Sequence, residues 1–365
     1  MYPRNFWYVA AMQHEVAAGR LFARTILNEP VVLYRRSDGS VTALQDRCIH
    51  RRVSLSLGTI VGDEVQCGYH GLRFAADGQC TSIPNQQSIP PRACIRSYPV
   101  VERDGFIWIW PGAPELARES EVPDFSDVCS SSDYVGRPAE ALRVGAPMLF
   151  NIENVLDLSH VTFVHQKTVG TPEVAMTAPE VTITDSYVEI GRAWDKITAA
   201  PVWRKVLGWD VVKRTQVLRF WPGGNIRLNM TFELPGNQDP AQVCRVSAVG
   251  PCTPETEHSH FKFSAMFRNF QKDDDEVTGF IFDEFHRTVL EDKVLIEDQS
   301  ANWRADSVVM SATGPFHGAP MIHIGVDRAP LAARRILQKL VASEAESEAS
   351  PRAARVVPIA NPACA

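Results

Sequence analysis

The chain has 365 residues, a formal net charge of −6 and 22% charged residues, values that are ordinary for a globular protein of two domains. This slightly acidic balance, without a stripe dense in lysine and arginine, excludes nucleic acid as a partner. Because no run of about 18 apolar residues occurs and the N-terminus lacks the pattern of a signal peptide, we expect a cytoplasmic protein that crosses no membrane. In that compartment, paired clusters of cysteine indicate metal binding more often than a disulfide.

Residues 1–112 are expected to form a small all-β domain. The segment 31–44 consists of two β-rich runs joined by Ser-Asp-Gly-Ser, which predicts a hairpin. A second turn of this kind is predicted at the Asp-Gly pair 77–78, and the alternating aromatic segment 106–110 ends at Pro-Gly. The cysteine and histidine clusters of this domain therefore fall in its loops.

Residues 113–140 are rich in Pro, Ser, Glu and Asp, which is typical of a connecting segment. The following part alternates between helical and strand-like patterns and predicts an α+β fold with a mostly antiparallel sheet. Helices are expected at 150–166, 274–300 and 328–343, and strands at 181–190, 216–234, 244–250 and 260–270. We therefore predict a first domain at 1–112, a second at 113–343, and a disordered polar tail at 344–365.

Two short clusters in the first domain, Cys48-x-His50 and Cys67-x-x-His70, could hold a metal. Zinc sites usually pair cysteine with cysteine and histidine with histidine, whereas each cluster here contributes one residue of each type. A Rieske [2Fe–2S] centre needs two cysteines on one iron and two histidines on the other. Glycines beside Cys67 and His70 would allow the backbone close to the sulfides. We therefore favour a Rieske centre, which relays electrons, over structural zinc.

Asn154, Asp157 and His160 are spaced three residues apart and would share one face of a regular helix. On such a helix, His165 would point roughly 140° away from His160. If both histidines bind one metal, the helix must kink or end between them. The alternative is that the two histidines are structural.

An anionic third ligand is expected in the helix 274–300. Asp292 is the acid inside an apolar stripe of this helix, where a buried carboxylate is costly unless a cation meets it. The neighbouring acids Glu291 and Asp298 lie off the stripe and are expected to be solvated. His160, His165 and Asp292 would then form the 2-His-1-carboxylate triad of non-haem Fe(II) oxygenases. Pairing of Asp292 with a lysine or arginine is the alternative. The stripe consists of Phe282, Phe285, Val289, Asp292 and Ile296.

The order of these motifs resembles the oxygenase component of Rieske non-haem iron oxygenases over nearly the whole chain. Several phrases are also similar to the vanillate O-demethylase oxygenase subgroup, which includes dicamba and toluenesulfonate monooxygenases. These phrases are MYPRNFWYVA, LSLG, CGYHGL, CIRSYPV, GFIWIWPG, RNF and EDK. The resemblance implies an N-terminal Rieske domain followed by a helix-grip domain that carries mononuclear iron.

The resemblance also implies a role for each candidate residue. Asp157 would bridge a histidine of the cluster to a histidine at the mononuclear iron, and Asn154 would lie close to that iron. Both are therefore candidate catalytic residues. The implied metal ligands are Cys48, His50, Cys67 and His70 for the cluster, and His160, His165 and Asp292 for the mononuclear iron.

For the whole enzyme, the resemblance implies a homotrimer in which the cluster of one subunit supplies electrons to the iron of the next. A separate reductase with flavin and a ferredoxin-type cluster would deliver electrons from NAD(P)H. The expected reaction is O2-dependent hydroxylation of the methyl group of an aryl methoxy acid, which then releases formaldehyde. Ring or side-chain oxygenation of another aromatic acid or sulfonate is the alternative. The competing classes are a Rieske electron carrier without a substrate and a zinc-stabilised binding module.

Two segments, 195–214 and 314–328, depart from the family pattern, so the substrate stays open. Basic residues in and beside the first segment could bind an aromatic carboxylate or sulfonate, although most lysines and arginines are simply exposed. These residues are Arg204, Lys205, Lys213 and Arg214.

Overall fold

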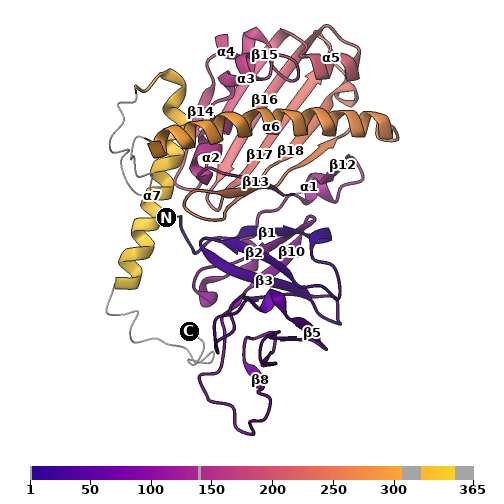
Figure 1. Ribbon diagram of the computed structural model, residues 1–365. Helices are drawn as coiled ribbons and strands as arrows, with labels where there is room; N and C mark the ends of the chain where they lie inside the picture. Colours follow the sequence, from indigo (N-terminus) through magenta and orange to yellow (C-terminus); the bar gives the residue numbers. More distant parts are fainter. Residues whose placement is uncertain (1, 139–140, 306–321, 350–365) are drawn as a thin grey trace. The chain divides into compact units, whose positions relative to one another are not determined.

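The computed structural model describes residues 2–138, 141–305 and 322–349 (Figure 1). These residues belong to two units, each with its own core. Of the described residues, 2–123, 253–256 and 340–349 form the N-terminal unit, and 124–138, 141–252, 257–305 and 322–339 form the C-terminal unit. Among the described residues, no helix is both long enough and apolar enough to span a membrane.

Within the described residues, the strands of the N-terminal unit pair antiparallel in three sheets, with the orders β1-β11-β10, β2-β3-β4-β9 and β5-β6-β7-β8. The predicted all-β character of this part is therefore confirmed. The strands are β1 (Tyr8–Met12), β2 (Phe22–Ile26), β3 (Glu29–Arg35), β4 (Val41–Gln45), β5 (Thr59–Val61), β6 (Glu64–Gln66), β7 (Arg73–Phe74), β8 (Cys80–Ser82), β9 (Ser97–Tyr98), β10 (Val100–Arg103) and β11 (Phe106–Ile109). Short 3-10 helices are η1 (Gln13–Glu15), η2 (Leu55–Leu57), η3 (Pro114–Leu116) and η4 (Glu119–Glu121).

Both predicted hairpin turns of this unit are confirmed. Between β3 and β4, the Asp38 carboxylate accepts a hydrogen bond from the backbone N–H of Ser40 at 2.9 Å, which closes the turn. Between β7 and β8, Gly78 has a φ of 86°, a left-handed conformation that favours glycine. A Cβ atom at this position would lie 2.0 Å from the carbonyl oxygen of Ile95, so no other residue fits there without a backbone shift.

A seven-stranded antiparallel sheet of order β12-β21-β18-β17-β16-β15-β14 dominates the described part of the C-terminal unit. Side chains alternate between the two faces of its strands. On β16 the buried side chains are therefore Val212, Arg214, Gln216, Leu218 and Phe220. The strands are β12 (Val135–Pro138), β14 (Glu180–Ile183), β15 (Val188–Thr198), β16 (Val211–Trp221), β17 (Asn225–Glu233), β18 (Cys244–Val249) and β21 (Ala265–Arg268). Outside this sheet, β13 (Leu142–Val144) pairs with β20 (His260–Lys262), and β19 spans Cys252–Pro254.

The long helix α6 (Asp275–Ala305) crosses the seven-stranded sheet (Figure 1). Its buried side chains include Val289, Asp292 and Ile296, which confirms this part of the predicted stripe and its one acid, whereas Phe282 and Phe285 are half-buried. A sheet that carries helices is the predicted α+β arrangement. The other helices are α1 (Ser126–Cys129), α2 (Met148–Leu156), η5 (Leu158–His160), α3 (Val161–Val164), α4 (Pro172–Met176), α5 (Pro201–Leu207), η6 (Pro240–Gln242), η7 (Gly325–Asp327) and α7 (Arg328–Ala349).

The predicted start of a disordered tail at residue 344 is wrong. Helix α7 continues to Ala349, and the Glu344 carboxylate accepts hydrogen bonds from the backbone N–H groups of Arg4 and Asn5, both at 2.7 Å. This contact gives the last turns of the helix a partner that local composition does not reveal. Residues 350–365 of the predicted tail lie outside the described residues. The domain limits 1–112 and 113–343 stay predictions, although the N-terminal unit continues to Pro123.

Candidate active site

The two cysteine–histidine clusters lie in two loops of the same construction. The backbone N–H of Cys48 donates to Val53 O and that of Cys67 donates to Leu72 O, both at 2.8 Å. Each loop buries its cysteine, at 2% exposure, and exposes its histidine. The rings of His50 and His70 are 4.5 Å apart between centroids. The four side chains therefore form one group, with both thiols inside and both imidazoles at the surface.

The glycine beside Cys67 was expected to allow the backbone close to the sulfides of a cluster, but the structure shows a different reason for it. A Cβ atom on Gly68 would lie 2.7 Å from the carbonyl oxygen of Leu57, so the loop passes tightly over a neighbouring backbone group. Burial raises the pKa of the Cys48 thiol to about 11, because a thiolate without a cation is costly in this core. The loop is therefore closely packed, and without a cation beside it the Cys48 thiol keeps its proton.

In the C-terminal unit, His160, His165 and Asp292 form a compact group. Oδ1 of Asp292 lies 3.4 Å from Nε2 of His160 and 3.1 Å from Nε2 of His165. One nitrogen or oxygen atom from each of the three lies within 4.8 Å of the others, so the group could hold a metal ion. It has the composition of the 2-His-1-carboxylate triad.

Hydrogen bonds keep the carboxyl group of Asp292 ionised. Burial alone would raise the pKa of Asp292, but the hydrogen bonds with His160 and His165 lower it well below the usual range of a carboxyl. Asp292 is therefore an anion although it is 6% exposed. A buried anion that faces two imidazole nitrogens is the electrostatic setting that a divalent cation needs.

The helix that carries Asn154 ends before His160. Helix α2 stops at Leu156, and Asp157 has a non-helical φ of −116° and ψ of 84°. The Asp157 carboxylate accepts hydrogen bonds from Ser159 N at 3.0 Å and Ser159 Oγ at 2.5 Å, which starts the 3-10 turn η5. The break predicted between His160 and His165 is a different one: it is the end of the short helix α3 at Val164, where His165 has a non-helical ψ of 32°. The predicted single helical face of Asn154, Asp157 and His160 is wrong, because the Asp157 side chain caps a new turn.

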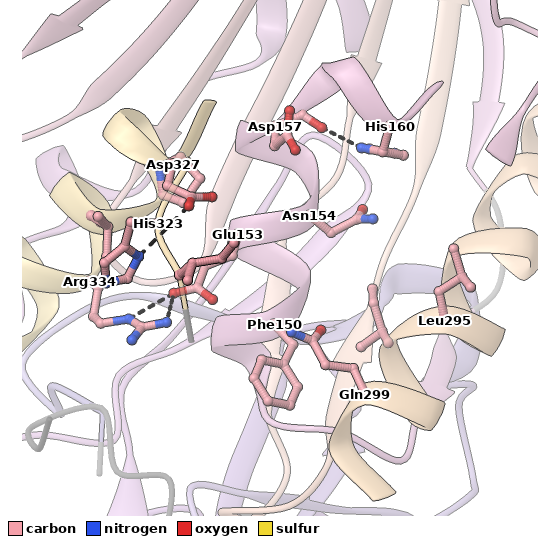
Figure 2. A pocket seen from close by; sticks show the side chains of 14 residues that line it. Phe150, Glu153, Asn154, Asp157, His160, Leu295, Gln299, His323, Asp327 and Arg334 are labelled. Atoms are coloured by element: carbon pink, nitrogen blue, oxygen red, sulfur yellow. Dashed lines mark hydrogen bonds and ion pairs between the residues drawn. The ribbon is translucent and has the colours of Figure 1, made fainter. Parts of the chain in front are cut away.

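Two further contacts hold the histidine rings. Nδ1 of His160 forms a short hydrogen bond with the carbonyl oxygen of Asp157 (Figure 2). Nδ1 of His165 lies 2.6 Å from Oε2 of Glu291. Glu291 was expected to be solvated, and that expectation is wrong: its side chain is 30% exposed but its carboxylate meets a buried ring. Each histidine thus has an oxygen atom at Nδ1 and directs Nε2 at Asp292, so that with a metal in the group Nδ1 would carry the proton and Nε2 would be the nitrogen that binds.

Asn154 lies beside the same triad. Its Nδ2 donates to Oδ1 of Asp292 at 3.2 Å. Its own Oδ1 is buried and has no hydrogen-bond partner among the described residues. A buried amide oxygen without a partner is uncommon in native proteins, and it marks a place where a ligand or a water molecule can bind.

Two hollows meet at Asn154 and His160. The outer pocket has a volume of about 290 Å³, and Figure 2 shows Glu153, Asp157 and Arg334 among its walls. The inner cavity has a volume of about 120 Å³ and lies between α6 and the seven-stranded sheet. All three triad residues line the inner cavity, whose other walls are mostly apolar, including Leu218, Leu228, Met230, Ala248, Phe285 and Val289. An apolar cavity of about this size holds a single aromatic ring.

Comparison with known protein families identifies both units. A model of the vanillate O-demethylase oxygenase C-terminal domain matches residues 144–343, and a model of the Rieske [2Fe–2S] domain matches residues 6–99. The chain belongs to the vanillate O-demethylase oxygenase family. It is the oxygenase component of a Rieske non-haem iron monooxygenase, with a [2Fe–2S] cluster and a mononuclear iron as its cofactors. This family assignment excludes the two competing interpretations, a Rieske electron carrier without a substrate and a zinc-stabilised binding module.

Relatives of this oxygenase match it over nearly their whole length. The chain is 33% identical to a toluene-4-sulfonate monooxygenase system iron-sulfur subunit from Comamonas testosteroni, over 94% of this chain and 98% of that protein. It is 33% identical to a vanillate O-demethylase oxygenase subunit from a Pseudomonas species, over 89% and 98%. The dicamba O-demethylase oxygenase component of Stenotrophomonas maltophilia is 34% identical, over 80% and 87%. A crystal structure of dicamba monooxygenase bound to 3,6-dichlorosalicylic acid superimposes with a TM-score of 0.84 at 32% identity, over 94% and 98%.

The basic residues beside segment 195–214 of this oxygenase have different environments. Arg204 pairs with Asp210 at 3.3 Å and Lys213 pairs with Glu233 at 3.1 Å, both near the surface. Lys205 is exposed and lies over the ring of Phe280. Arg214 alone among the four lines the inner cavity, at 4% exposure. The simple expectation of solvated basic residues therefore holds for the first three only.

Sequence reasoning missed Lys262, which also lines the inner cavity of the oxygenase. It is 7% exposed, and its Nζ donates to Oδ1 of Asn151 at 3.1 Å. Its charge contributes to the low pKa of Asp292. The short strand β20 buries His260 and Lys262 on one face, but neither residue is apolar, so the sequence carries no periodic signal for a buried lysine there.

Proposed function

We propose that this oxygenase removes the methyl group of an aryl methyl ether that carries an acid group, and releases it as formaldehyde. The observation that carries the proposal is the position of the His160, His165 and Asp292 triad in the wall of an apolar cavity of single-ring size. Two of its relatives are described as oxygenase components of O-demethylases, one for vanillate and one for dicamba.

We assign the metal ligands from the same geometry. Cys48 and Cys67 would hold one iron of the cluster, and His50 and His70 the other. The burial of both thiols and the 4.5 Å separation of the histidine rings support this assignment. The three atoms within 4.8 Å of one another support His160, His165 and Asp292 as ligands of the mononuclear iron.

When bound, the two metal centres supply electrons and activate O2. The residues of the chain position the reacting groups. Glu291 accepts a hydrogen bond from Nδ1 of His165, and the carbonyl of Asp157 accepts one from Nδ1 of His160, so that both Nε2 atoms would be free for the metal. The apolar cavity wall holds the ring and keeps water out. Insertion of one oxygen atom into a methyl C–H bond, with a pair of electrons and a pair of protons reducing the other to water, gives a hemiacetal that separates into a phenol and formaldehyde.

Electron delivery would use a separate NAD(P)H-dependent reductase with flavin and a ferredoxin-type cluster. The relatives described as an oxygenase component and as a subunit of a monooxygenase system support a partner of this kind. We further propose a homotrimer in which Asp157 connects the cluster of one subunit to His160 of the next. The position of Asp157 in the wall of the outer pocket, beside His160, supports this role.

Hydroxylation of an aryl methyl group is the second candidate reaction. It is favoured by the toluene-4-sulfonate monooxygenase subunit, which is 33% identical over 98% of its own length. The two reactions need the same iron site and the same apolar cavity, since each oxidises a methyl group on an aromatic ring. They differ in the product, because only the ether releases formaldehyde.

A substrate panel tests the proposal. The holoenzyme with a surrogate reductase should consume O2 in the presence of one or more methoxybenzoates and release formaldehyde in equal amount. Methylbenzoates and methylbenzenesulfonates serve as matched compounds without the ether oxygen. Coupled O2 consumption with these compounds alone, giving a hydroxymethyl product, would replace the proposed reaction by the second candidate.

A further inference from the structure

Arg214 has an environment that is unusual for a charged residue. It lies on β16, which has a neighbouring strand on each side, is 4% exposed and lines the inner cavity. Its Nη2 donates to Oε1 of Gln216 at 2.5 Å, and its guanidinium lies over the rings of Trp194 and Phe232 at 5.7 and 5.5 Å. Its Nε is buried and has no hydrogen-bond partner among the described residues.

The charge of Arg214 is not balanced by an acid. Among the described residues no carboxylate forms an ion pair with it, and the charged neighbour that affects it is another cation, Arg192. Burial therefore lowers the pKa of Arg214 to about 10, with Arg192 adding to the effect. A buried cation without a partner is strongly unfavourable, so its retention in a cavity wall indicates a partner that comes from outside the chain.

The other buried cations of this region are compensated. Lys262 lies in the same cavity, but its charge acts on the anionic Asp292 and its Nζ donates to Asn151. Arg192 donates from Nε to the carbonyl oxygen of Thr177 at 2.8 Å and is stabilised by the charge of Asp157. The uncompensated positive charge in the inner cavity is thus that of Arg214, whose Nε–H has no acceptor among the described residues.

We propose that Arg214 is the anion-binding residue of the substrate site, and that it takes the carboxylate or sulfonate of a single-ring aromatic substrate. Gln216 accepts a hydrogen bond from Nη2, so part of the guanidinium is held by the chain while its charge is left for the anion. Since Arg214 and the His160, His165 and Asp292 triad line one cavity of about 120 Å³, the anion and the oxidised methyl group lie at different points of the same ring. The oxidation of the methyl group in this inference rests on the proposed function, whereas the binding of the anion by Arg214 does not.

The test measures binding without turnover. Calorimetry on the oxidised holoenzyme, without reductase, compares benzoate and benzenesulfonate with neutral benzamide, which has nearly the same shape. We expect at least one anion to bind about tenfold or more tightly than benzamide. In Arg214→Met, that anion should lose about 30-fold or more in affinity, as for a truncated buried charge pair, whereas benzamide should change by less than about twofold. The anion that binds more tightly identifies the acid group.

Two further variants make the test decisive. Arg204→Met removes an exposed arginine that pairs with Asp210 and should bind the anions as the wild type does. Arg214→Lys keeps the charge without the planar guanidinium and should lose less affinity than Arg214→Met. Equal binding of benzoate, benzenesulfonate and benzamide by the wild type, or an equal loss of all three in Arg214→Met, would overturn the inference.

Failure of this inference and failure of the proposed function give different results. If methoxybenzoates release formaldehyde but anion affinity does not depend on Arg214, the function stands and the inference fails. If no methoxybenzoate is demethylated but benzoate or benzenesulfonate binding still depends on Arg214, the anion site stands and the reaction must be another oxidation of an aromatic acid.

Discussion

Replacement of Glu291 should weaken iron binding although Glu291 is not one of the proposed ligands. Its carboxylate accepts a hydrogen bond of 2.6 Å from Nδ1 of His165, whose ring is 1% exposed and cannot turn to water instead. Loss of a hydrogen bond to a charged acceptor costs about 2 kcal/mol in a buried setting, which corresponds to about 30-fold in affinity. This lies within the range of about 10- to 100-fold observed for the outer partners of metal ligands.

The assay is anaerobic dialysis of the oxygenase, with its cluster intact, against graded Fe(II), followed by measurement of iron beyond that of the cluster. Glu291→Ala should raise the dissociation constant about 30-fold, and Glu291→Gln less, because the amide oxygen can still accept the proton of Nδ1. Asp298→Ala is the matched control, since Asp298 is an exposed acid of the same helix that bonds to Asn302. Wild-type iron affinity in Glu291→Ala would refute the proposed role of this contact.

Three other changes have clear expected outcomes. Asp292→Ala should lose the mononuclear iron, measured by metal analysis, while the visible spectrum of the Rieske cluster persists. Asp157→Asn should keep both metal centres but transfer electrons between them at least about tenfold more slowly, measured by stopped-flow oxidation of the cluster. His260 is fully buried with its pKa lowered to about 4 by burial, so the stability it contributes is present above its unfolded pKa of about 6.5 and is lost as pH falls toward 4. Between those pH values, the free energy of unfolding measured by chemical denaturation should fall by up to about 3 kcal/mol more in the wild type than in His260→Gln.

Each of these outcomes has a contrary result. Full mononuclear iron in Asp292→Ala would move the anionic ligand to another residue. Wild-type electron transfer in Asp157→Asn would remove Asp157 from the electron route. An unchanged pH dependence of unfolding in His260→Gln would show that a different group controls acid stability in this unit.

Several parts of the site could be predicted from sequence because their signal is local. The mixed spacing of Cys48, His50, Cys67 and His70 distinguishes a Rieske centre from zinc without any structure. Asp292 could be identified because a helical period of apolar residues with one acid has a single physical explanation, which is burial beside a cation. These predictions depend on neighbours in the chain and on the period of one element.

Other parts depend on how distant elements meet. Glu291 lies one position from Asp292 and therefore on a different side of α6, and only the approach of His165 at the end of α3 makes it a partner of that ring. The last turns of α7 are ordered by contacts of Glu344 with residues at the start of the chain. Neither contact can be predicted from the local amino-acid composition.

Arg214 and Asp157 are intermediate cases. The alternation of β16 places Arg214 on the same face as Val212 and Leu218, so its burial could have been read from the strand period, but the absence of an acidic partner could not. Asp157 precedes Ser159 in the Asx pattern that starts a new turn, and this pattern predicts a break that the three-residue spacing alone conceals.

The central claim is that the oxygenase hydroxylates the methyl carbon of an aryl methyl ether. A single-turnover reaction of the reduced holoenzyme with a methoxybenzoate and isotopically heavy O2 tests it directly by mass spectrometry of the phenol. We expect a phenol that retains the oxygen of the ether and carries no heavy label, together with an equal amount of formaldehyde. A heavy label in the phenol, or a ring-hydroxylated product that keeps its methoxy group, would contradict it.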